Sequence, residues 1–95
     1  MNVTWKLGTS TGHWAATHRG IRMVINVNQT TGKASEIAWF IGGRLDEISP
    51  VNCDLGAAKK LAIIVVDRRI LEEGDWAKAE EKDLRSLHLN QHETQ

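Results

Sequence analysis

A strict two-residue alternation over residues 21–28 constrains the fold of this chain more than any other feature of its sequence. One side of the segment is entirely apolar and the other is mostly polar: Ile21, Met23, Ile25 and Val27 against Arg22, Val24, Asn26 and Asn28. This period is typical of a β-strand that buries one face against a core. Residues 34–41 repeat the alternation after a turn that contains Gly32, so the two segments predict a β-hairpin.

Two shorter alternating segments, residues 3–7 and residues 13–17, precede this hairpin. Together the four segments predict an antiparallel meander of three or four strands over residues 3–41, joined by turns that contain glycine. Three tryptophans fall on the core-facing side of these strands: Trp5, Trp14 and Trp39. Gly42 and Gly43 are expected to end the sheet, and Ser49 and Pro50 are expected to lie in a loop.

The second half of the chain predicts helices. Residues 54–73 carry an apolar stripe at helical spacing that would cover the sheet: Leu55, Ala58, Leu61, Ala62, Val65 and Val66. The β-branched residues within 61–66 also fit a buried strand, but the flanking alanines and charged residues favour a helix. Residues 75–89 predict a second helix, and residues 90–95 predict a frayed tail.

The expected fold is therefore a single α+β domain over residues 1–95. It consists of a three- or four-stranded antiparallel meander packed against one long helix, with a shorter C-terminal helix. Ile64 and Leu71 lie on the far side of the first helix and call for a second partner. That partner is either the second helix folded back as a helical hairpin or a second copy of the chain, which makes a homodimer possible.

The charges balance over the chain but not along it. Twelve basic and twelve acidic side chains cancel, which removes any argument from net charge for nucleic acid or an anionic membrane. Before Glu36, however, four cations meet no acid: Lys6, Arg19, Arg22 and Lys33. Residues 72–83 are predominantly acidic. Two explanations stay open: the basic end binds an anionic partner, or the basic sheet and the acidic helix neutralise each other.

Reactive residues give no catalytic or metal-binding pattern. Cys53 is the single cysteine, so neither an internal disulfide nor a multi-cysteine zinc site can form. The spacing of the histidines and the glycines predicts neither a metal site nor a phosphate loop. The chain is therefore expected to be no enzyme and to need no cofactor. The first residues lack an apolar signal core and the longest apolar run spans 61–66, so a cytoplasmic protein outside the membrane is expected.

Two surfaces are candidates for binding a partner. On the outer face of the sheet, apolar residues are surrounded by basic and amide groups, the pattern of a binding face: Phe40, Val24, Arg22, Asn26, Lys6 and His13. The second candidate is a set of helical residues that would meet a partner or a second copy: Ile64, Leu71, Trp76, Leu84 and Leu87.

The tryptophan-bearing meander with glycine turns and a following helix resembles small phage and prophage accessory proteins. The residues that carry this resemblance are Trp5, Gly12, His13, Trp14, Gly32, Trp39 and the segment 55–62. It implies a viral protein that binds and inhibits host proteins. Residues 12–16 are also similar to a strand of ethylene-response-type DNA-binding domains, and the order of strands and helix is similar to integrase arm-binding domains. The likeness to the ethylene-response-type family implies a sheet face in the major groove, offering Lys6, His13, Arg22 and Asn26, although the arginine-rich first strand is missing.

From the sequence we expect a non-enzymatic protein-interaction module of the phage accessory or inhibitor type, which acts by binding a host or self protein. The alternative is a small nucleic-acid-binding protein that uses the basic outer face of the sheet.

Overall fold

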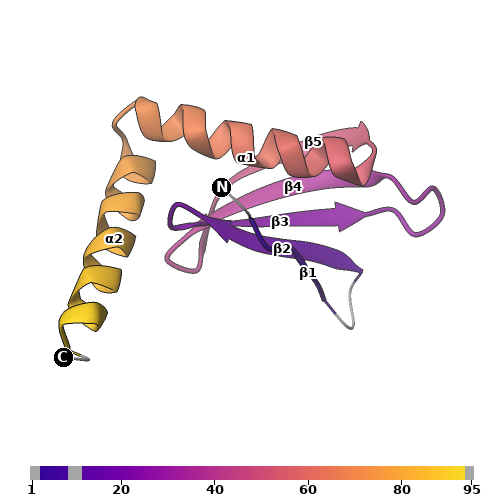
Figure 1. Cartoon of the computed structure of the whole chain (residues 1–95). Helices are drawn as coiled ribbons and strands as arrows, with labels where there is room; N and C mark the ends of the chain where they lie inside the picture. The colour runs from indigo at the N-terminus through magenta and orange to yellow at the C-terminus, as the bar shows by residue number, and fades with distance from the viewer. Residues whose placement is uncertain (1–2, 9–11, 94–95) are drawn as a thin grey trace.

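The computed structural model describes residues 3–8 and 12–93, with side chains described as far as Leu87. Its elements follow in the order β1 (Lys6–Leu7), β2 (His13–His18), β3 (Ile21–Val27), β4 (Ala34–Ile41), β5 (Arg44–Cys53), α1 (Leu55–Leu71) and α2 (Asp75–Glu93). The strands form one antiparallel sheet in sequence order, and α1 lies across one of its faces (Figure 1). The α+β class and the antiparallel meander are therefore confirmed.

The sheet has five strands, so the prediction of three or four strands ending at residue 41 was wrong. Gly42 and Gly43 do not end the sheet; both have positive φ, at 58° and 81°, and they form the two-residue turn of another hairpin. The strand that follows, β5, is the longest in the sheet at 10 residues. Pro50 lies within it because β5 is an edge strand, where a missing N–H can face away from the sheet.

The core lies between α1 and the inner face of the sheet. The helix contributes residues spaced four apart, and the sheet contributes alternate positions of β3 and β4: Ala58, Ala62, Val66 and Ile70 against Met23, Ile25, Ile37 and Trp39. The two alanines bring the helix so close that Trp39 Nε1 donates a hydrogen bond to the Ala62 carbonyl oxygen at 3.2 Å. Leu61, expected in the buried stripe, is exposed instead.

The other two core-facing tryptophans lie at the margin of this core. Trp5 and Trp14 are partly buried and pack against it near the start of α1. Lys59 lies over both rings, with its Nζ 4.3 Å from the Trp14 ring centroid and 6.0 Å from the Trp5 centroid. A cation over an aromatic face is an attractive contact, so Lys59 helps to hold α1 against this edge of the sheet.

The second helix turns sharply away from α1 instead of folding back along it (Figure 1). Of the two alternatives for the second helix, the helical hairpin is therefore wrong, and Ile64 and Leu71 stay exposed. At 19 residues α2 is not shorter than α1, which has 17, and it continues to Glu93 through most of the segment predicted as a frayed tail. Residues 94 and 95 lie outside the described residues. The radius of gyration, 14.4 Å, exceeds the roughly 12 Å typical of a chain this long, because α2 projects from the body.

Within the described part of the chain, neither helix combines the length and the apolar character that crossing a membrane requires.

Candidate binding face

The face of the sheet that points away from α1 is covered by no other described element, and we call it the open face (Figure 1). Strand register places rows of residues side by side on it, since register partners point to the same face. The central row is Lys6, Ala15, Val24, Ala38 and Ile48. The rows on either side are Thr17, Arg22, Phe40 and Leu45, and His13, Asn26, Glu36 and Pro50. The predicted sheet-face residues Lys6, His13, Arg22, Val24, Asn26 and Phe40 are therefore together on the open face.

An apolar patch extends over β3, β4 and β5 on the open face. Phe40 and Val24 are partly exposed, and Ala38 between them is buried by its neighbours. Leu45 and Ile48 of β5 extend the patch and are 50% and 51% exposed. These two residues were not predicted from the sequence, because the sheet was expected to end at Gly42 and Gly43.

The part of the open face formed by β1, β2 and β3 is basic. Lys6 and Arg22 are exposed there, and neither has an acidic partner among the described residues. The acid on the neighbouring row, Glu36, lies on β4. Lys6 and Arg22 therefore keep their positive charge available to a ligand.

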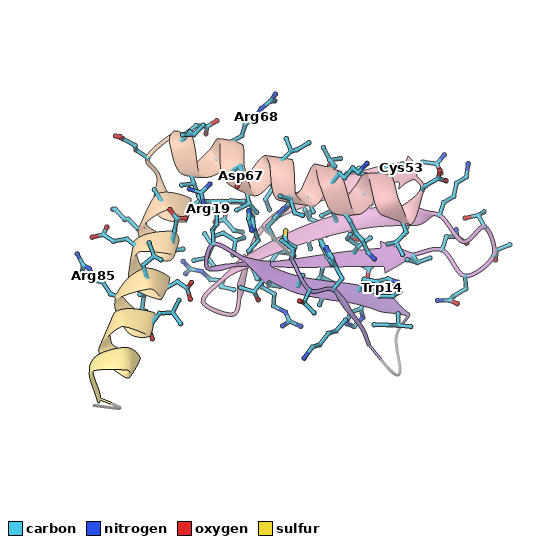
Figure 2. All side chains as sticks on the ribbon, in the orientation of Figure 1. Trp14, Arg19, Cys53, Asp67, Arg68 and Arg85 are labelled. Atoms are coloured by element: carbon cyan, nitrogen blue, oxygen red, sulfur yellow. The ribbon has the colours of Figure 1, made fainter. Side chains whose placement is uncertain are left out.

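Arg19, by contrast, is neutralised inside the protein. It sits in the turn between β2 and β3, and its guanidinium bonds Asp67 of α1 at 2.9 Å and Glu80 of α2 (Figure 2 shows Arg19 and Asp67 side by side below α1). The hydrogen bonds to Glu80 and to Asp67 raise the pKa of Arg19 further above its already high value. The idea that the basic sheet neutralises the acidic helix therefore holds for Arg19 but not for Lys6 and Arg22, which lie on the opposite face.

His18 also contacts Asp67, so polar side chains connect the β2–β3 hairpin to both helices. His18 is only 6% exposed, and its Nε2 lies 2.9 Å from Asp67 Oδ1. Partial burial alone would raise the pKa of Asp67, but hydrogen bonds from Arg19 and His18 outweigh it and hold that pKa below its ordinary value. His18 is thus a satisfied core histidine, and His13 lies on the other face of the same strand.

The helical candidate residues do not form one surface. Ile64, Leu71, Leu84 and Leu87 are exposed, whereas Trp76 is 2% exposed and belongs to the core, so its assignment to an outer contact surface was wrong. The Trp76 ring centroid lies 6.2 Å from that of Trp39, and its Nε1 donates to Asp46 Oδ2 at 2.6 Å. Asp46 is the extra residue where the register of β4 and β5 shifts, and such bulges re-aim side chains. Trp76 therefore anchors α2 to the body.

No group of three or more potential metal ligands occurs among the described residues. No family model, no curated protein and no solved structure matches this chain.

Proposed function

We propose that this chain is a protein-interaction module that acts by binding, without catalysis, and that its open face is the binding surface. The observation that carries the proposal is the contiguous apolar patch of Val24, Phe40, Leu45 and Ile48 on a sheet face that no described element covers. Contiguous exposed apolar surface of this kind is typical of protein interfaces.

The composition of the face suits a protein partner. Leu45 and Ile48 are half exposed, so burying the remaining area of each contributes about 1 kcal/mol. Arg22 is the register neighbour of Phe40, and arginine beside an aromatic residue is a frequent composition of the residues that dominate binding energy. The partner that fits has an apolar centre flanked by acidic residues. The resemblance to phage accessory proteins supports a host or self protein as that partner.

Nucleic acid is the second candidate, because Lys6 and Arg22 lie unneutralised on the same face. Two cations neutralise about two phosphates, so the logarithm of the binding constant should fall with the logarithm of the salt concentration with a slope of about −2. Proteins that bind duplexes through their phosphates make roughly 6–10 such contacts, which gives a much steeper dependence. Fluorescence anisotropy with labelled single- and double-stranded DNA and RNA, at low and physiological salt, distinguishes the two. We expect a flat titration at physiological salt; micromolar binding that weakens steeply with salt favours nucleic acid.

The protein-binding proposal is tested by selecting ligands from a displayed library of random peptides and measuring their affinity for defined variants. Phe40→Ala and Ile48→Ser remove apolar contacts from the open face. Leu84→Ser is the matched control, since Leu84 is 58% exposed, close to Ile48, but lies on α2. We expect the open-face variants to weaken the selected peptides at least about fivefold and the control to leave them unchanged. Peptides that bind all three variants equally would contradict the proposal.

A further inference from the structure

A hollow of about 350 Å³ opens in the basic half of the open face. Ala15, which has a small side chain, lines the hollow and lies in register between Lys6 on β1 and Val24 on β3. Its neighbours two positions along β2, His13 and Thr17, carry larger side chains. The hollow therefore exists because a small residue is surrounded by larger ones.

The polar part of the lining donates hydrogen bonds or carries positive charge, and the rest is apolar or glycine: Leu7, Gly8, Ala15 and Ala16. Lys6 and Arg22 contribute cations, Thr4 and Thr17 contribute hydroxyl groups, and His13 contributes an imidazole. Among the described residues that line it, none is acidic. A concave site with two cations and several donors favours an oxyanion over a neutral or cationic group.

We infer that this hollow receives a carboxylate, presented by an Asp or Glu side chain of the partner protein. This inference rests on the proposed function, since the hollow adjoins the apolar patch through Arg22 and Phe40, which are register partners. A single partner segment can bury apolar side chains on β3–β5 and place an acidic side chain over Ala15. Arg22 suits this role because a guanidinium binds a carboxylate through two parallel hydrogen bonds.

The test is a titration of the ¹⁵N-labelled chain with sodium acetate at constant ionic strength, with chloride as the replaced anion and inorganic phosphate in a parallel series. We expect saturable amide shifts that centre on Ala15, Thr17 and Arg22. Arg22→Gln should weaken acetate binding about three- to fivefold, as the loss of one exposed ion pair predicts. Ala15→Val keeps every charge but narrows the hollow, and it should weaken the saturable binding of acetate. Lys33→Gln is the matched control, because Lys33 belongs to the same acid-free stretch but lies in an exposed turn away from the hollow.

Shifts that never saturate, or that Ala15→Val leaves unchanged, would overturn the inference. Saturable binding of phosphate without acetate would also overturn it and point to a nucleic-acid or phosphoprotein ligand. These outcomes are separate from failure of the proposed function. If selected peptides still need Phe40 and Ile48 while acetate finds no site, only the carboxylate inference fails; if no peptide depends on the open face, the proposed function fails.

Discussion

Replacing Gly20 with alanine tests how α2 docks on the body. Gly20 has a φ of +82°, and a Cβ there would lie 2.8 Å from the Ala79 carbonyl oxygen and 3.0 Å from the Asp83 Cβ. The positive φ costs an alanine about 1–2 kcal/mol. Relieving the clash with helix backbone requires α2 to move, which costs about 1–3 kcal/mol more, as overpacking does. We expect Gly20→Ala to lower the free energy of unfolding by about 2–5 kcal/mol in total.

Gly32→Ala is the matched control for this prediction. Gly32 has a similar φ of +73°, but a Cβ added there would meet no atom within 4 Å, so only the backbone cost of about 1–2 kcal/mol applies. Urea unfolding followed by tryptophan fluorescence measures both variants, and amide hydrogen exchange shows whether α2 loosens in Gly20→Ala alone. Equal losses of stability in the two variants, within about 0.5 kcal/mol, would refute the described packing of α2 against the β2–β3 turn.

Three further predictions concern residues in the two helices or at their ends. Trp76→Phe keeps an aromatic ring but loses the hydrogen bond to Asp46, so urea unfolding should show a loss of about 1.5–3 kcal/mol; an unchanged midpoint would contradict the contact. Because hydrogen bonds hold the pKa of Asp67 below its ordinary value, its ionised form stabilises the fold above about pH 4, and this contribution is lost as the pH falls through the lower pKa of the folded state. Asp67→Asn should therefore cost stability near neutral pH and progressively less in acid, as denaturation series at several pH values would show; a cost independent of pH would refute this. Glu73 has a φ of +55° just after α1, a conformation that glycine adopts more easily. Glu73→Gly should therefore raise the free energy of unfolding by about 0.5–1 kcal/mol and with it the thermal midpoint. A lower midpoint would argue against that geometry.

The strand at residues 21–27 could be predicted from the sequence because one of its faces is fully buried. Ile21, Met23 and Ile25 have no exposed surface, so the apolar period of two is unbroken. The strand β5 could not be predicted in the same way. It is an edge strand with bulges, and its alternation is interrupted by Asp46 and obscured by Pro50. Edge strands bury less and tolerate proline, so their sequence carries a weaker signal.

This difference between central and edge strands also explains which residues of the open face could be predicted from the sequence. Lys6, Arg22 and Phe40 belong to strands with clear alternation, so their shared face followed from the pattern. Leu45 and Ile48 were missed with β5. Trp76 was assigned to a contact surface because it falls on roughly the same side of the second helix as Leu84 and Leu87. Its burial against Trp39 depends on the sharp turn between the helices, which no local pattern indicates.

Mapping where a peptide ligand contacts the chain tests directly whether the open face is the binding surface. The tightest peptide selected from the displayed library is titrated into the ¹⁵N-labelled chain, and amide shifts are assigned to individual residues. If the open face binds the ligand, the largest shifts occur at Val24, Ala38, Phe40 and Ile48, with little change at Leu71 and Leu84 on the helices. Shifts centred on the exposed leucines of α1 and α2, with the open face unperturbed, would contradict that assignment.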